Sequence, residues 1–319
     1  MMNNLEGIAF EEVIAGNGTS YASFRKTLEP RYGKVMFDIG KGYFFLIVFI
    51  SISILVFREA PWTWWIISPV CGMMIGYCTA YIALFIHEAG HFNIHPDKVV
   101  NDKLATWLLC LPFGLSMKSY RKIHWQHHLH LGTMEDAEVS YFKALTKLFM
   151  VEMLTGIHLL KTVLRKEKNP YLGKEQLQNS RKMLIVGILF HLAVITVLLL
   201  TGNWPAAIAW VLGFGIFFPF FAALRQVLEH RDEKANSKAD FFKTPHGKVS
   251  RIFVHNIISS SFGSAGFTRH MIHHWDPQIS YTRLADVEEF LEQSERTADF
   301  IKGSRTNYST VLNKLLKAN

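Results

Sequence analysis

The chain has 319 residues, half of them hydrophobic and 13% aromatic, and a formal net charge of +8. Its mean hydropathy of +0.15 is high for a soluble protein of this length and indicates membrane spans rather than a larger core. No motif for RNA or DNA accompanies the basic balance, so we exclude nucleic acid as a partner and expect loops that face anionic lipid. Cys71, Cys78 and Cys110 lie in apolar stretches without a CxxC pair, and they indicate neither disulfides nor a thiolate metal site.

The first predicted elements are a polar cap and a pair of membrane helices. Residues 1–40 carry acidic side chains and lack the apolar core of a signal peptide, so we expect a cytoplasmic N-terminal cap. Residues 43–57 and 61–86 are apolar, and only three residues separate them. A membrane helix needs about 20 apolar residues, which the first stretch reaches by extension through Gly40. Residues 41–86 therefore predict a transmembrane hairpin.

A second pair of membrane helices is predicted further along the chain. Residues 183–200 and 205–224 are apolar and joined by a short turn, so residues 183–224 predict a second hairpin. The tryptophans near the two hairpin tips fall at one membrane face, as in an aromatic belt. A weaker apolar stretch, residues 104–117, contains a proline and a glycine, and we expect an interfacial or re-entrant segment there.

The distribution of Lys and Arg predicts the topology. Of the 34 basic residues, 33 lie outside the two hairpin tips. By the positive-inside rule, both termini, the loop of residues 87–182 and the C-terminal region of residues 225–319 are cytoplasmic. The predicted fold is therefore all-α and integral to the membrane, a single multi-pass domain over residues 1–319. It has four transmembrane helices in two hairpins and a cytoplasmic helical cap.

Eight of the 15 histidines fall in three clusters on the predicted cytoplasmic side: HEAGH at 87–91, HWQHH at 124–128 and HMIHH at 270–274. Spacings of three and four residues put each cluster on one face of a helix. Imidazole suits iron, zinc and copper, and eight imidazoles are too many for one ion, so two ions are predicted. The candidate ligands are His87, His91, His124, His127, His128, His270, His273 and His274.

Three such boxes, with one pair of spans between the second and the third, resemble the membrane fatty acid desaturase and hydroxylase family. The flanks YRKIHWQHHLHLGTMEDAE and HMIHHWDPQISYTRL are also similar to that family's boxes. The resemblance covers roughly residues 40–285, and three boxes in order are far more specific than any one of them. It implies that these eight histidines hold two irons, that O2 is a co-substrate and that a C–H bond of a lipid is cleaved.

The resemblance also implies one further ligand near the end of the fourth span. His230 is the candidate, with His255 and Asn256 as alternatives. The two electrons must come from outside, because the chain holds no flavin or haem motif. The basic cytoplasmic face suits an acidic electron-transfer protein of the ferredoxin or cytochrome b5 type. Carboxylates that flank the boxes are expected to accept the second imidazole N–H. They are Glu135, Asp136, Glu138 and Asp276.

The predicted function is an O2-dependent diiron oxidoreductase, a fatty acid desaturase for acyl-lipid or acyl-CoA substrates. A membrane lipid hydroxylase of the same family is an alternative, because both reactions use the same ligands. A second alternative is an intramembrane zinc metalloprotease that uses HEAGH, with Glu88 as general base, but six histidines then have no role. His191, in mid-span, faces either a substrate tunnel or a neighbouring helix. Arg225 either binds a substrate head group or snorkels.

Overall fold

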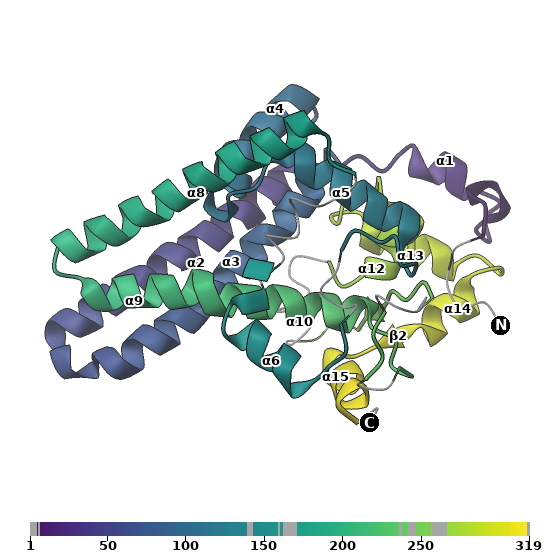
Figure 1. Ribbon diagram of the computed structural model, residues 1–319. Coiled ribbons are helices and arrows are strands. Elements are labelled where there is room, and N and C mark those ends of the chain that lie inside the picture. The colour runs from purple at the N-terminus through teal and green to yellow at the C-terminus, as the bar shows by residue number, and fades with distance from the viewer. Residues whose placement is uncertain are drawn as a thin grey trace.

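The computed structural model of the chain is mostly helical (Figure 1). It describes residues 5, 7–138, 143–158, 160–161, 171–235, 238–241, 247–254, 256 and 267–317. Four helical stretches are long and apolar enough to cross a membrane, where a helix satisfies its own backbone hydrogen bonds. They are Tyr32–Glu59, Pro61–Gly90, Lys174–Leu200 and Trp204–His230.

These long stretches are built around one central helix. They consist of α2 (Tyr32–Glu59), a 3-10 turn (Pro61–Thr63), α3 (Trp64–Gly90), α8 (Lys174–Leu200), α9 (Trp204–Leu212), a π-helical segment (Gly213–Phe217) and α10 (Phe218–His230). The central helix is α3, which packs against α2, α9 and α10. The ends of α3 and α10 consequently meet beside the shorter helices that carry the remaining histidines (Figure 1).

Shorter elements complete the chain. A 3-10 turn (Phe10–Glu12) and α1 (Tyr21–Arg25) precede α2. Between α3 and α8 lie α4 (Lys98–Leu104), a π-helical segment (Ala105–Cys110), a 3-10 turn (Leu111–Phe113), α5 (Met117–His130) and α6 (Lys147–Leu154). After α10 come β1 (Ile252–Phe253), α12 (His270–Trp275), α13 (Leu284–Glu292), α14 (Ala298–Gly303), β2 (Arg305–Thr306) and α15 (Tyr308–Lys317). The strands pair in parallel, with Ile252 opposite Arg305.

Two glycines explain how closely α3 approaches the fourth stretch. A Cβ on Gly72 would lie 2.9 Å from the Cβ of Leu212, and one on Gly76 would collide with Phe217. Small residues four apart let two membrane helices come into backbone contact. The packing of α3 against α9 and α10 therefore depends on the absence of side chains at these positions.

The helices extend beyond the apolar stretches of the sequence. α2 begins at Tyr32, and Asp38 in its polar first turns is buried. This carboxylate accepts hydrogen bonds from Lys34 at 2.6 Å, from Lys41 at 3.2 Å and from the Tyr281 hydroxyl at 2.8 Å. Because two lysines of the same helix and the tertiary partner Tyr281 satisfy the charge, the helix can start well before the apolar run does.

The apolar stretch at residues 104–117 forms no membrane-length helix. Its π-helical and 3-10 segments end at Gly114, which has a φ of +58° and turns the chain. Ser116 then caps α5, because its hydroxyl accepts the backbone N–H of Ser119. Trp107 on this stretch is 65% exposed. Its interfacial location remains a prediction.

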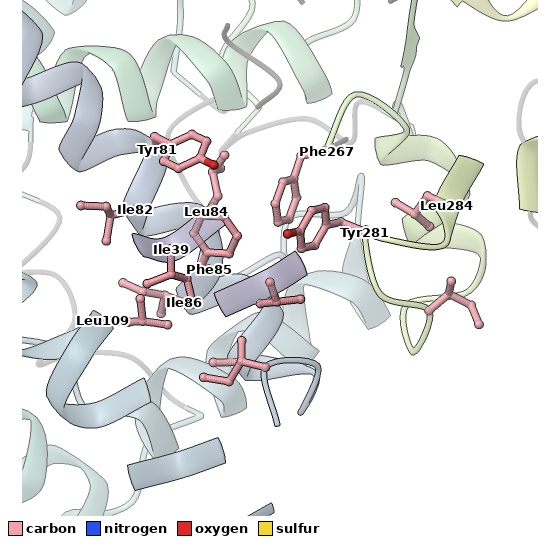
Figure 2. Close-up of a cluster of buried hydrophobic side chains, with 14 of the residues drawn as sticks. Ile39, Tyr81, Ile82, Leu84, Phe85, Ile86, Leu109, Phe267, Tyr281 and Leu284 are labelled. Carbon is pink, nitrogen blue, oxygen red and sulfur yellow. The ribbon is translucent and has the colours of Figure 1, made fainter. Parts of the chain in front are cut away.

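A buried apolar cluster joins the end of α3 to the segment after the third box (Figure 2). The rings of Phe267 and Tyr281 stack with centroids 4.6 Å apart, and Phe85 meets both edge-on. Ile86 packs in the same cluster, directly before His87. Burial of these side chains fixes the last turn of α3, and hence the first histidine box, against the C-terminal part of the chain.

Candidate metal centre

All nine predicted histidines lie in two groups, within each of which the candidate ligand atoms are within 4.8 Å of one another. The first histidine group consists of His87, His91, His124, His128 and His273. The second histidine group consists of His127, His230, His270 and His274. The structure thus brings together eight residues from three boxes and adds His230 from the end of α10.

Helical geometry decides which group each histidine joins. His124 and His128 are four residues apart on α5 and both belong to the first group, whereas His127 points to the second. On α12 the pair four residues apart, His270 and His274, belongs to the second group, and His273 belongs to the first. Each of these two helices therefore contributes to both groups.

The first box is not wholly helical. His87 lies in the last turn of α3, but His91 is the residue that ends the helix, with φ −93° and ψ 7°. The prediction that both share one helix face is therefore wrong in detail. His91 still lies in the same group, with the ring centroids of His87 and His91 5.1 Å apart.

The ring nitrogens of each group converge. The Nε2 atom of His124 lies 3.0 Å from that of His91 and 3.1 Å from that of His128. In the second group, the Nε2 atom of His270 lies 2.9 Å from that of His230 and 3.1 Å from that of His274. Two nitrogen ligands at right angles on one ion, each about 2.1 Å away, lie about 3.0 Å apart, so these spacings fit a shared cation.

Several buried ring nitrogens are otherwise unsatisfied. Within the described part of the chain, both nitrogens of His87 and the Nδ1 atoms of His91, His128 and His274 have no hydrogen-bond partner. A buried ring nitrogen without a partner is unfavourable, and an ion among the converging nitrogens would satisfy one nitrogen of His87. The two groups also touch, with the rings of His128 and His274 4.6 Å apart. The donor set therefore fits two adjacent metal ions.

Most of these imidazoles are held neutral. Burial, followed by repulsion from neighbouring imidazoles, lowers the pKa of His128, His273 and His274 well below the ordinary value. The same causes lower the pKa of His91 and His270. Neutral imidazole is the form that binds a metal, so the site is prepared for cations without first losing protons at these residues.

His127 is the exception, because two carboxylates lie beside it. Burial opposes its charged form, but Glu138 and Asp136 outweigh this and raise the pKa of His127 to about 9. Both carboxylate oxygens of Asp136 lie 2.9 Å from its Nδ1 atom. In the first group, Glu138 lies 3.0 Å from Nδ1 of His124. These two carboxylates stand where a partner that orients a ligand imidazole is expected.

The other two flanking carboxylates were predicted wrongly. Glu135 pairs with His130 at 3.3 Å, at the surface and away from both groups. Asp276 is buried and accepts hydrogen bonds from the Tyr21 hydroxyl at 3.0 Å and from Arg25 Nε at 2.5 Å. It therefore anchors the N-terminal segment to the end of α12 instead of touching a histidine of either group.

Sequence reasoning missed two partners of the second group. Glu229 is buried, with an oxygen 3.7 Å from Nε2 of His270, and it binds Arg225 at 2.7 Å. The position of Glu229 directly before His230 in the sequence could have identified it as a candidate. The backbone carbonyl of Val249 lies 2.9 Å from Nδ1 of His230. A backbone group leaves no signal in the sequence, so this partner could not be predicted. Arg225 is thus bound inside the protein, which neither of its two predicted roles describes.

The remaining candidates have other positions. Asn256 is exposed and donates to the side chain of Asn307 at 3.1 Å, and His255 lies outside the described residues. His191 lies 2.8 Å from the carbonyl of Pro112 and accepts from Trp210 at 3.1 Å. Of its two predicted roles, the hydrogen-bonded contact with neighbouring elements is confirmed.

Comparison with known families matches residues 63–299, about three quarters of the chain, to the family described as fatty acid desaturase. A search of curated proteins finds no match. The matched region contains both histidine groups and three of the four apolar stretches. The chain is a membrane protein that belongs to the fatty acid desaturase family.

Proposed function

We propose that the chain is an O2-dependent diiron oxidoreductase that introduces a C=C bond into the acyl chain of a lipid or acyl-CoA. The observation that carries the proposal is the pair of touching histidine groups at the ends of apolar helices. The proposed ligands are the nine histidines of those groups. Two irons, when bound, supply the activation of O2 and the oxidising power for an unactivated C–H bond.

The proposed topology has two hairpins, α2 with α3 and α8 with α9–α10, and a cytoplasmic face that holds both termini and the histidines. The positive-inside rule supports it, since Arg58 is the one basic residue at the hairpin tips. Exposed tryptophans near the tips, Trp62 at 70% and Trp65 at 58%, support an interface there.

The apolar interior supports a lipid substrate. A small apolar cavity lies between the long helices, and its lining includes Thr79 and Ile82 of α3, Phe190 of α8 and Trp210 of α9. Thr79 precedes His87 by eight residues, about 12 Å along the helix axis. In the proposed reaction, apolar side chains between the helices hold the acyl chain and exclude water. One methylene then lies at the histidine groups.

The carboxylates have orienting roles in this proposal. Asp136 and Glu138 hold His127 and His124 by their Nδ1 atoms, which leaves Nε2 of each ring directed into its group. Arg225 balances the charge of Glu229 beside His270. Electrons come from an acidic carrier of the ferredoxin or cytochrome b5 type, for which the basic surface is the supporting feature.

The protease alternative has little support from the surroundings of Glu88. One oxygen of this buried carboxylate accepts from the Ser280 hydroxyl at 3.0 Å and from the backbone N–H of Tyr281 at 3.3 Å. A general base must instead face an activated water. Glu88 anchors the segment after the third box, and the seven group histidines outside HEAGH have no use in a one-zinc site.

Metal content and product analysis test the proposal. We expect about two irons per chain in detergent-purified protein, with the coupled Mössbauer signature of a dinuclear centre. We also expect unsaturated acyl chains in lipids of cells that express the protein. One zinc per chain and no iron would overturn the proposal. Hydroxylated chains without new double bonds would favour the hydroxylase of the same family.

A further inference from the structure

We propose that an acidic one-electron carrier protein docks on the face formed by α4 and α5 and delivers electrons through Trp125 to the first histidine group. This rests on the proposed function, because converting two methylenes and one O2 into an alkene and two waters consumes two further electrons and two protons. The sequence has no flavin or haem motif. Both electrons must therefore enter from the protein surface, one per carrier.

Trp125 connects the surface to the first histidine group. It lies in α5 directly after His124 and is only partly buried. Its ring centroid is 5.2 Å from that of His91, nearly edge-on, and 5.8 Å from that of His128. One aromatic side chain thus contacts solvent on one side and two members of the group on the other.

The same face of α5 is exposed and basic. Lys118, Lys122, Trp125 and Leu129 are spaced by four, three and four residues, which places them in one stripe along the helix. The two lysines are exposed, and Leu129 is 64% exposed. The stripe therefore combines positive charge with an aromatic and an apolar contact, the composition of a protein-binding surface.

The basic surface continues onto α4. Phe92 follows His91 directly. The Arg121 guanidinium lies over its ring, 3.8 Å from the centroid, and the Lys98 ammonium lies 5.1 Å from the same centroid. Arg121 also donates to the carbonyl of Gly90 at 2.9 Å and to Asp102 at 3.0 Å. These contacts hold cations around the segment that carries His91.

Positive charge is in excess on this face. Its exposed lysines, Lys98, Lys103, Lys118 and Lys122, form no ion pair with any described residue. The two carboxylates among them are occupied, Asp97 by capping α4 and Asp102 by Arg121. Such a surface steers an acidic protein into contact. Anionic lipid would also bind lysines, but we favour a carrier because Trp125 on this face contacts the first histidine group.

The electron balance is simple. In each encounter the reduced carrier loses one electron and the metal centre gains one, and two encounters supply one turnover. No bond of Trp125 forms or breaks, and the indole ends each transfer in its starting redox state. The two protons that accompany the electrons come from solvent.

The test compares two routes of reduction in the iron-loaded, full-length protein in nanodiscs of neutral lipid. Anaerobic reduction is followed by stopped flow with a reduced acidic [2Fe–2S] ferredoxin and, separately, with dithionite. We expect Lys118→Glu with Lys122→Glu to lower the ratio of the two rates at least tenfold at low ionic strength. The ferredoxin dissociation constant should rise by a similar factor, and salt should diminish both effects.

The matched control is Lys302→Glu with Lys317→Glu, which changes the net charge equally on α14 and α15, well separated from α4 in Figure 1. Its rate ratio should stay within twofold of the parent. For the electron path, Trp125→Leu should lower the rate ratio at saturating ferredoxin, where the affinity no longer matters, whereas Trp125→Phe, which keeps a ring, should retain most of that ratio.

Equal rate ratios in the parent and the α5 charge-reversal variant would overturn the docking proposal while O2 consumption and iron content leave the proposed function intact. An effect seen only in nanodiscs of anionic lipid would also overturn it, since the lysines would then contact head groups. A parent protein that holds no iron would instead defeat the proposed function, and the docking proposal with it.

Discussion

The two histidine groups differ in the hydrogen-bond partners of their ring nitrogens. Among the five rings of the first group, His124 has a carboxylate at hydrogen-bond distance from Nδ1, whereas in the second group His127 has Asp136 and His230 has a backbone carbonyl. Both groups also have a carboxylate 3.7 Å from a ring nitrogen, Glu88 beside His87 in the first and Glu229 beside His270 in the second. Hydrogen bonds to partners outside the group are thus more frequent in the second group, so substitutions behind the rings should affect the two differently.

The largest expected effect comes from removing a ring from either group. His273→Ala in the first group and His127→Ala in the second should each abolish turnover, because both halves of the centre are needed, while the protein stays in the membrane. His130→Ala is the matched control, since His130 lies on α5 outside both groups. Product formation and metal content measure the effect. Full activity in either group variant would contradict the ligand proposal.

Carboxylate substitutions should separate the two groups. Asp136→Asn should weaken metal binding in the second group, and Glu138→Gln in the first, each by about 10- to 100-fold, because loss of such a partner leaves the imidazole poorly oriented. Titration of metal-free protein with Fe²⁺ measures both affinities. Glu135→Gln, which removes a carboxylate at the surface, should change neither. Equal losses at both sites in each variant would show that the groups do not bind metal separately.

In the metal-free protein, His127 and the other histidines of the two groups should change the free energy of unfolding in opposite directions as the pH rises. The pKa of His127, raised to about 9, contributes stability that is complete below pH 6.5 and is lost as the pH rises through 9. The lowered pKa values of the α12 histidines act oppositely, so their contribution is lost as the pH falls below 6.5. Between pH 6.5 and 8 we expect the contribution of His127 to the free energy of unfolding to fall by about 2 kcal/mol, while each histidine with a lowered pKa adds about 0.4 kcal/mol.

Unfolding in detergent at several pH values measures this dependence. His127→Gln removes the falling contribution, so its free energy of unfolding relative to the parent should rise by about 2 kcal/mol between pH 6.5 and 8, whereas His130→Gln should leave the pH dependence unchanged. An unchanged pH dependence in His127→Gln would contradict the raised pKa of His127.

The smallest expected effect concerns α12, which serves both groups. Arg25→Gln removes a charged hydrogen bond to Asp276 at the end of this helix and should destabilise the protein by about 1.5 kcal/mol. It should weaken metal binding in both groups equally. Lys26→Gln, an exposed neighbour, is the control. Weaker metal binding in one group alone would show that the end of α12 does not position the histidines of both groups.

The family, the apolar stretches and the eight box histidines could be predicted because each is a local pattern. Spacings of three and four residues identify a helix face wherever the helix lies, and a long apolar run predicts a span without its neighbours. The carboxylates were only half predicted, because a position next to a box in sequence does not say which way the chain turns. Asp136 reaches His127, whereas Asp276 faces Tyr21 and Arg25.

The sequence by itself thus determined the membrane helices, the family and the supply of imidazoles. Only the tertiary structure decided that α5 and α12 each divide their histidines between two groups, that His230 completes the second group, and that the N-terminal segment anchors α12. The physical reason is that these features depend on contacts between residues as far apart in the sequence as Arg25 and Asp276, which no local pattern records.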